Sequence, residues 1–176
     1  MKIYTKASSD VYDRVAHLIR LFRPDLLDAG LKVDLLFIST DDENDEEPPL
    51  KLNGYPCYAV VRVVDVKGRT MGRGDAEIVI DEAQYLVMND PKRDALLDHE
   101  LHHIELVLTP KGRVKLDCRK RPQLTMRKHD RQYGWFDAIA QRHGINSIEV
   151  QQAQSLVLAG TQIYFGFMDS VPKLKK

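Results

Sequence analysis

Three residues near the middle of the chain have the types and the spacing that metal-assisted hydrolysis requires. His99 and His103 lie one helical turn apart, and Glu100 follows the first of them, which gives the pattern H-E-x-x-H. On a helix the two histidines lie about 40° apart around the axis, and Glu100 falls in the same sector. In this pattern the histidines bind zinc and the glutamate acts as a general base.

A helix that carries this pattern must also pack on a core. We predict a helix over residues 91–108, with Asp90 as its cap and Pro91 in its first turn, where a missing N–H costs nothing. His102 lies on the side away from His103 and is expected to line the cleft or face solvent. The apolar residues of this helix fall on a separate stripe, which suits packing on a core: Leu97, Leu101, Ile104 and Leu108.

A catalytic zinc ion usually has three protein ligands and one open position, so a third ligand must come from elsewhere. We favour His129, because it stands where an extended segment passes into a helix. Asp130 beside it can cap that helix or accept a hydrogen bond from a ligand histidine. Asp130 and His143 remain alternatives, and the full set of candidates is Asp117, Cys118, His129, Asp130, His143 and Glu149.

The elements around the histidines indicate an α+β fold in a single domain, residues 1–176. We expect a mixed sheet of three to five strands, packed against the metal-binding helix and two to three further helices. A third strand, formed by Ala76, Glu77, Ile78, Val79 and Ile80, is a candidate exposed edge that a peptide substrate could extend. Other predicted segments are helices at 9–22, 131–143 and 148–159, strands at 31–40 and 55–66, an acidic loop at 41–54, a hairpin at 109–128, and a C-terminal helix and tail at 147–176.

Composition restricts the partners only weakly. Lysine plus arginine equal aspartate plus glutamate at 26 each, but residues 113–131 are rich in basic side chains, which suggests a contact with nucleic acid. Cys57 and Cys118 lack a metal-binding spacing and are typical of a reducing compartment. Without a signal peptide or a segment of membrane-spanning length, the expected location is the cytoplasm.

Two blocks of the sequence resemble the putative phage metallopeptidase family, a group of small zincin-like proteins. The segment 94–103 looks like the metal helix of that family. Arg121-Pro122, Lys128-His129-Asp130 and Arg142-His143-Gly144 resemble its second conserved block. The resemblance spans residues 31–144, and the chain is similar, more distantly, to SprT-type and other minimal zincins.

This resemblance implies a minimal zincin-like domain with one zinc ion per chain, held by His99, His103 and His129, with Glu100 as base. It also implies a protein or peptide substrate and, for a phage-encoded chain, the host cytoplasm. The chain departs from the family at Tyr133, where a phenylalanine is expected, and at Gly134 inside the predicted helix.

The resulting hypothesis is a zinc metallopeptidase in which Tyr133 or Arg127 steadies the oxyanion. The main alternative is a non-catalytic, zinc-containing module that binds DNA or protein. Glu100 argues against that alternative, because a structural site needs no base beside its ligands. Hydrolysis of a bond other than a peptide bond also remains open.

Overall fold

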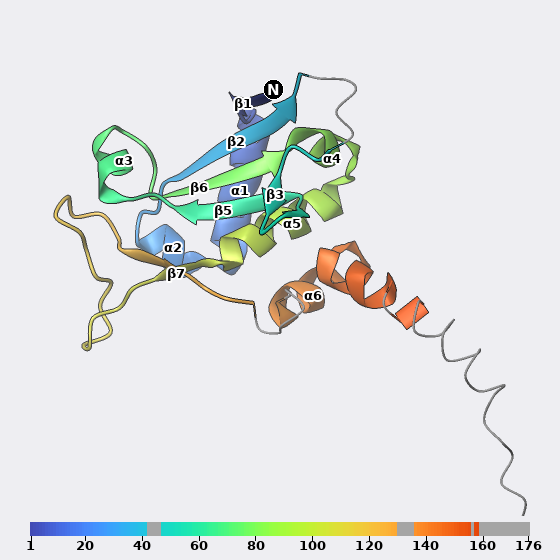
Figure 1. Cartoon of the computed structure of the whole chain (residues 1–176). Coiled ribbons are helices and arrows are strands. Elements are labelled where there is room, and N and C mark those ends of the chain that lie inside the picture. The colour runs from blue at the N-terminus through green and yellow to red at the C-terminus, as the bar shows by residue number, and fades with distance from the viewer. Residues whose placement is uncertain (42–46, 130–135, 156, 159–176) are drawn as a thin grey trace, which may run out of the picture.

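One mixed sheet forms the centre of the protein. The computed structural model describes residues 1–41, 47–129, 136–155 and 157–158 (Figure 1). The strand order is β1 (Lys2–Lys6), β2 (Val33–Thr40), β6 (Ala76–Asp81) and β5 (Ala59–Val63). β2 is parallel to β6, whereas the two outer pairs are antiparallel. The predicted α+β fold with a mixed sheet of three to five strands is confirmed.

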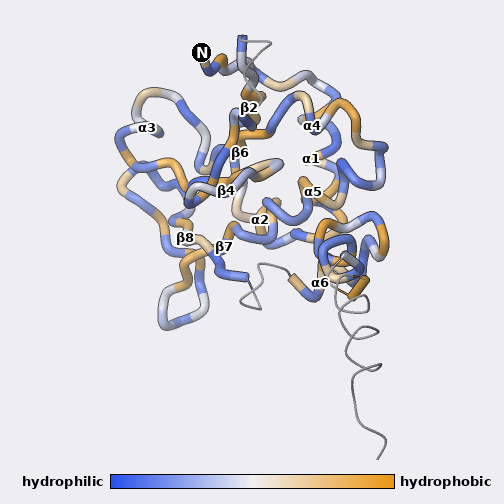
Figure 2. Tube along the Cα trace, turned by 45° about the vertical axis from the view of Figure 1, so that its right-hand side comes forward, coloured by the Kyte–Doolittle hydropathy of each residue, from blue (hydrophilic) through white to orange (hydrophobic). Residues whose placement is uncertain are grey.

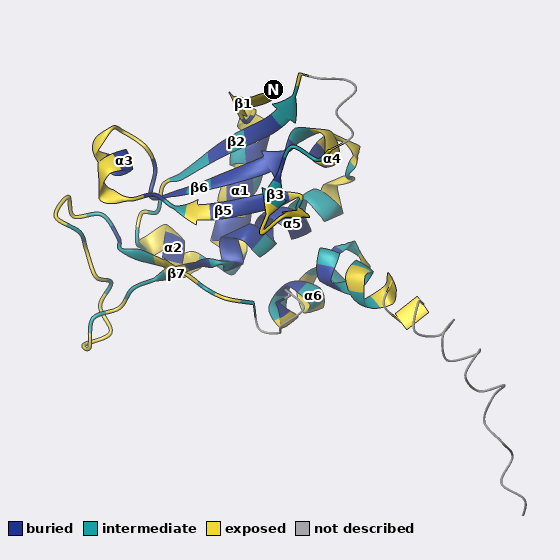
Figure 3. Cartoon of the chain, in the orientation of Figure 1, coloured by how far each residue is buried: buried dark blue, intermediate teal, exposed yellow. Residues whose placement is uncertain are grey.

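Helices α1 (Ser9–Phe22), α2 (Pro24–Asp28) and α5 (Asp90–His102) cover one face of this sheet. The apolar side of α1 fits its period, since Val11, Val15, Leu18 and Ile19 are buried. Figure 3 shows that β6 is buried along most of its length, whereas α5 is buried from Ala95 towards its C-terminal end. The core residues that are fully buried between sheet and helices include Leu26, Leu35, Ile78, Ile80, Leu97 and Leu101.

A smaller apolar cluster lies on the opposite face. Leu50 covers Ile38, Val60 and Val79 there, so the sheet residues of both parities are buried. The segment around Leu50 continues into the short hairpin of β3 (Lys51–Leu52) and β4 (Tyr55–Pro56). Asn53 and Gly54 both have positive φ values, 52° and 85°, as a tight hairpin turn requires. The predicted acidic loop at 41–54 therefore contains a strand, and its residues 42–46 lie outside the described part.

The strand order corrects the predicted substrate edge. Ala76, Glu77, Ile78, Val79 and Ile80 belong to β6, which pairs with β2 on one side and β5 on the other. That strand is therefore interior, and β5 is the edge on the side of α5. The physical reason is visible in its burial, because five of the six residues of β6 are buried and these lie on both faces, as in a central strand.

The helix that carries the H-E-x-x-H pattern is shorter than predicted. It ends at His102 instead of Leu108, and its N-cap is Asn89, whose side chain accepts a hydrogen bond from Lys92 N–H. Residues Ile104–Leu106 form β7, which pairs with β8 (Leu124–Met126). Ile104 and Leu108 suit helical spacing, but Ile104 and Leu106 equally suit the alternation of a strand, and pairing with β8 decides between them.

Two partners fix this helix end in space. The guanidinium of Arg23 donates hydrogen bonds to the carbonyl oxygens of Leu101 and Ile104, at 2.6 and 2.7 Å. The N–H of Arg127 donates to the carbonyl of His103 at 2.7 Å. Carbonyls at the end of the helix thus find partners in Arg23, between α1 and α2, and in Arg127, which follows β8. A helix terminus needs such partners when it is buried.

The chain after β8 returns to α5. Helix α6 (Asp137–His143) and the turn η1 (Gly144–Asn146) precede a helical segment at 148–155 that Ser147 caps by accepting a hydrogen bond from Val150 N–H. Of the helix predicted at 131–143, the described part contains residues 137–143, which form α6. Residues 130–135, including Asp130 and Tyr133, lie outside the described part. The short remaining helix α3 (Val66–Thr70) follows β5, and α4 (Glu82–Val87) follows β6. No described helix has the length and apolarity needed to cross a membrane.

Candidate metal centre

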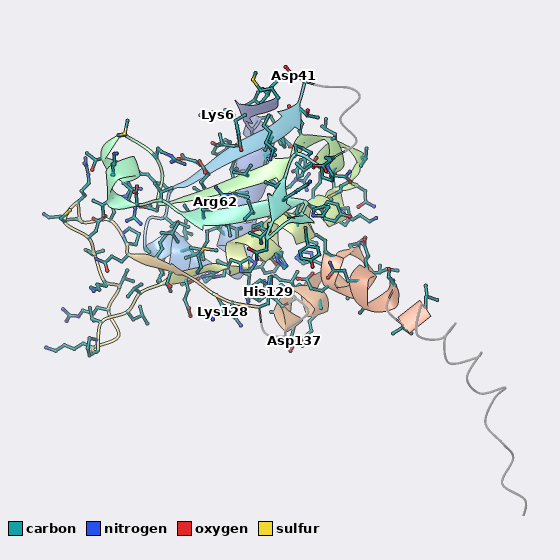
Figure 4. All side chains as sticks on the ribbon, viewed as in Figure 1. Lys6, Asp41, Arg62, Lys128, His129 and Asp137 are labelled. Carbon is teal, nitrogen blue, oxygen red and sulfur yellow. The ribbon has the colours of Figure 1, made fainter. Side chains whose placement is uncertain are left out.

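Three histidine side chains converge at the end of α5. His99 lies in the helix and His103 is its C-cap residue. His129, labelled in Figure 4, comes from the segment that follows β8. The Nε2 atom of His99 lies 3.3 Å from Nε2 of His103 and 3.2 Å from Nε2 of His129. Within the described residues these three histidines form the group able to hold a metal ion, with ligand atoms within 4.8 Å of one another.

These separations fit zinc. Two nitrogen atoms bound to one tetrahedral zinc ion at about 2.0–2.1 Å lie about 3.3–3.4 Å apart. The two Nε2 separations measured from His99 fall at this value or slightly below it. The donor set therefore suits zinc, and three nitrogen ligands leave a fourth position for water or substrate.

The other ring nitrogens of the α5 histidines are held by oxygen atoms. Nδ1 of His99 lies 2.6 Å from Oε1 of Glu149, and Nδ1 of His103 lies 2.8 Å from the carbonyl oxygen of Arg127. A carbonyl oxygen can only accept, so Nδ1 of His103 carries the proton and its Nε2 presents a lone pair. Glu149 has the same effect on His99, and both contacts orient the rings towards the common centre.

Glu149 is the functional residue whose role the sequence did not indicate. It was a candidate ligand, but its carboxylate contacts the far side of the His99 ring, and its side chain is only 2% exposed. Its pKa is lowered, because the hydrogen bond and charge of His99 outweigh the effect of burial. Burial alone would lower the pKa of His99, yet the hydrogen bond that Nδ1 donates to Glu149 and the charges of the nearby carboxylates Glu100, Glu149 and Asp98 raise it.

Glu100 shares the histidine side of α5 and is 5% exposed. Burial raises the pKa of its carboxyl group, partly opposed by the charge of His99 and by a hydrogen bond from the backbone N–H of Val61 in β5. Burial also lowers the pKa of His103 to about 4, so its ring is neutral and available to a metal near pH 7. The site thus combines a neutral His103 ring with a carboxyl group of raised pKa.

A cleft of about 330 Å³ opens onto these residues. Its floor is α5, one wall is β5 with the β3–β4 hairpin, and the other wall is the helical segment after Ser147. The polar groups on the floor and at the mouth are His99, Glu100, His103 and His129, while most other lining residues are apolar: Leu52, Pro56, Ala59, Val60, Val61, Leu96, Met126 and Ile148.

The ring of Phe136 packs against the rings of the three histidines. It is fully buried, and its ring centre lies 5.0 Å from that of His99, 4.7 Å from that of His103 and 5.1 Å from that of His129. His102 also contacts this ring, at 4.5 Å, and is buried, so its predicted position in the cleft or in solvent is wrong. The phenylalanine limits the rotation of all these rings.

Arg127 has a different position from the one expected of an oxyanion donor. Its guanidinium donates to Nε2 of His102 at 2.7 Å and lies over the ring of Phe136. It does not line the cleft. The other predicted donor, Tyr133, and the predicted helper Asp130 lie outside the described residues.

The remaining candidate ligands lie elsewhere. His143 and Arg142 both donate to the buried carboxylate of Asp98, at 2.9 Å, and thereby attach α6 to α5. Asp117 pairs with Arg69, and Cys118 is exposed in the loop between β7 and β8. The structure thus brings together His99, His103 and His129, and keeps these others apart from them.

The helix of the H-E-x-x-H pattern beside the edge of a small mixed sheet defines a zincin-like α+β domain with a candidate metal centre. A comparison with protein families agrees with this class, since the model of the putative phage metallopeptidases matches residues 4–157. The chain belongs to this family, as the two sequence blocks indicated. Neither a curated protein nor a solved structure matches the chain.

Proposed function

We propose that the protein is a zinc-dependent peptidase in which His99, His103 and His129 hold one zinc ion and Glu100 is the general base. The observation that carries the proposal is the convergence of three Nε2 atoms at separations that suit tetrahedral zinc. A buried carboxyl group lies in the same cleft. Membership of a family described as metallopeptidases supports a peptide as the substrate.

Zinc would supply Lewis-acid chemistry, which lowers the pKa of water towards neutrality and polarises a carbonyl group. Glu100 takes the proton of the attacking water at its carboxylate and returns it to the leaving amine. A general base works best when its pKa lies near the working pH, and the burial of Glu100 shifts its pKa in that direction. The N–H of Val61 orients this carboxylate at the edge of β5.

The edge of β5 offers a place for an extended peptide. Val64 N–H donates to Asp75, and the carbonyl of Tyr58 accepts from Asp81, so the even-numbered residues of β5 face β6. The backbone groups of Ala59, Val61 and Val63 consequently point outwards. The N–H of Val61 is occupied by Glu100, and the remaining outward groups can pair with a further strand. Ala59 and Val61 also line the cleft, so a peptide paired there passes over the histidines.

The walls of the cleft favour apolar side chains on both sides of the scissile bond. Leu52 of β3, Met126 of β8 and Ile148 of the C-terminal helical segment all line the cleft. Burial of such a side chain contributes about 25 cal/mol per Å² of apolar surface, before the cost of ordering the peptide.

A glutamine in place of Glu100 tests the proposed base. The Glu100→Gln substitution keeps the shape of the side chain but removes the base, so we expect hydrolysis of casein or of a peptide library to fall at least ~100-fold, with zinc content unchanged. Glu105→Gln is the matched control, because Glu105 is exposed on β7 and contacts no histidine of the site. Hydrolysis retained in the Glu100→Gln variant would exclude this residue as base.

A further inference from the structure

A strongly basic loop joins β7 to β8 and is separate from the cleft. This loop, residues 107–123, contains a single acidic residue, Asp117, and six basic ones. Five of the basic side chains are exposed: Lys111, Arg113, Lys115, Arg119 and Lys120. None of these five forms an ion pair within the described part of the chain. In a protein with no net charge, this loop concentrates positive charge at one end of the molecule.

The one carboxylate of the loop does not offset this charge at the surface. Asp117 accepts hydrogen bonds from the guanidinium of Arg69 at 3.0 Å and from the backbone N–H groups of Arg119 and Arg121. Its side chain is only 4% exposed. The loop therefore presents cationic groups to solvent, while its acidic group holds the backbone turn.

The loop is also attached firmly to the body of the protein. Arg121 pairs with the buried carboxylate of Asp75 at 2.7 Å, and Arg69 donates to the carbonyl of Pro122 at 3.0 Å. The α3 segment and the loop lie side by side in Figure 1, at the end of the molecule away from the C-terminal helix. Figure 2 shows the tip of this loop as mainly hydrophilic. A charged surface held in place loses little entropy when a ligand binds.

A pocket of about 410 Å³ lies where the loop meets the start of β2 and the turn before β6. Five cationic side chains line it, and Asp34 is the acidic one. Asp34 accepts a hydrogen bond from Gly74 N–H at 2.7 Å, so part of its charge is already satisfied. The cationic residues are Lys32, Arg69, Arg73, Arg119 and Arg121. Arg69 and Arg121 pair with buried carboxylates and Arg73 pairs with Glu77, whereas Lys32 and Arg119 form no ion pair within the described residues. These two side chains are the cations of the pocket that can bind a phosphate group.

We propose that the basic loop and this pocket together bind nucleic acid through its phosphate backbone. The pocket suits one phosphate group, and the row of exposed cations beside it suits the regular charges of a polymer. Arg113 and Lys115 lie on the same side of an extended segment, about 6.6 Å apart. The pocket shares no lining residue with the cleft over the histidines, so a bound strand leaves the cleft open. This inference does not depend on the proposed peptidase activity.

Fluorescence anisotropy of a labelled single-stranded oligodeoxynucleotide tests the proposal. Wild-type protein should bind it with an affinity that falls as salt rises. Arg113→Ala/Lys115→Ala should weaken binding about tenfold or more, and should reduce the slope of log K against log salt by about 1.4, since each phosphate contact on a single strand contributes about 0.7. The control Lys2→Ala/Lys6→Ala removes the same charge from exposed positions on β1 and should bind like wild type.

Several outcomes would overturn the proposal. They are an absence of binding at low salt, an equal loss in the β1 control, and competition by polyglutamate as strong as that by unlabelled oligonucleotide. A mononucleotide that binds as tightly as the oligonucleotide would reassign the pocket to a small ligand. Arg119→Ala provides a second variant in the pocket itself, and it too should weaken oligonucleotide binding.

Discussion

Oε1 of Glu149 lies 2.6 Å from Nδ1 of His99, although the two residues are 50 positions apart in the sequence. This contact joins the C-terminal helical segment to the first histidine of the H-E-x-x-H pattern. It fixes the ring of His99 so that Nε2 faces the other two histidines. The site is therefore complete only when the chain beyond α6 has folded onto α5.

Removal of this carboxylate should weaken the metal site without removing a ligand. We expect Glu149→Ala to lower zinc affinity by about 10- to 100-fold, the usual effect of losing a group that orients a metal ligand. Competition with a chromogenic chelator measures this affinity. Ser155→Ala on the same helical segment is the control, since its hydroxyl contacts only the carbonyl of Gln151. Equal zinc affinity in Glu149→Ala and wild type would show that the contact does not orient His99.

Phe136 should matter for both stability and metal binding. Its ring is fully buried against the histidine rings, so Phe136→Ala leaves a cavity and should lower the free energy of unfolding by about 3–5 kcal/mol. Phe136→Leu fills more of that space and should cost less in urea denaturation. The zinc affinity of the two variants should follow the same order, and a reversed order would contradict the packing role.

The end of α5 provides a third prediction. Arg23→Ala removes both donors to the carbonyls of Leu101 and Ile104 and should lower the free energy of unfolding by about 1–3 kcal/mol. The exposed Arg20 on the same helix α1 is the matched control, and Arg20→Ala should change stability by less than about 0.5 kcal/mol. Similar urea midpoints for both variants would show that Arg23 does not cap the helix.

The stability of the metal-free protein should decrease on the acid side of neutrality. Burial, with the charge of Arg127 next, lowers the pKa of His102 to about 4, below the ordinary value of 6.5. The unfolded chain therefore takes up this proton as the pH falls below 6.5, whereas the folded protein does so only near pH 4. The contribution of His102 to the free energy of unfolding is therefore complete above pH 6.5, and it is lost as the pH falls towards 4.

Glutamine at position 102 tests that assignment. His102→Gln keeps an acceptor for Arg127 but cannot titrate, so its urea midpoint should fall less between about pH 7 and about pH 5 than that of wild type. His103, whose pKa is also lowered to about 4, remains in the variant and preserves part of the effect. An identical pH dependence in both proteins would exclude His102 as the titrating group.

Local patterns in the sequence predicted the parts of the site that depend on local geometry. The spacing of His99, Glu100 and His103 on a helix requires only the helical period, and that arrangement is observed. The position of His129 after an extended segment also predicted its approach to the pair, and the structure places it there. Glu149 and Phe136 were not predicted in their roles, because each acts through contacts with chain segments far away in sequence.

The order of strands shows the same limit. β1 is exposed along its whole length, so no apolar alternation marks it in the sequence. Its pairing with β2, and that of β5 with β6, make β6 interior and move the free edge to β5. Similarly, the end of α5 depends on β8, which follows it after a long loop. Patterns within one segment identify such elements but not their neighbours.

Metal content is the most direct test of the central claim that His99, His103 and His129 hold a catalytic zinc ion. Wild type and His143→Ala should each carry one zinc ion per chain, because His143 contacts Asp98 and not the cluster. His129→Ala should lose most of this zinc while its circular dichroism spectrum remains that of a folded protein. Stoichiometric zinc in His129→Ala, measured by atomic emission after dialysis, would contradict the account.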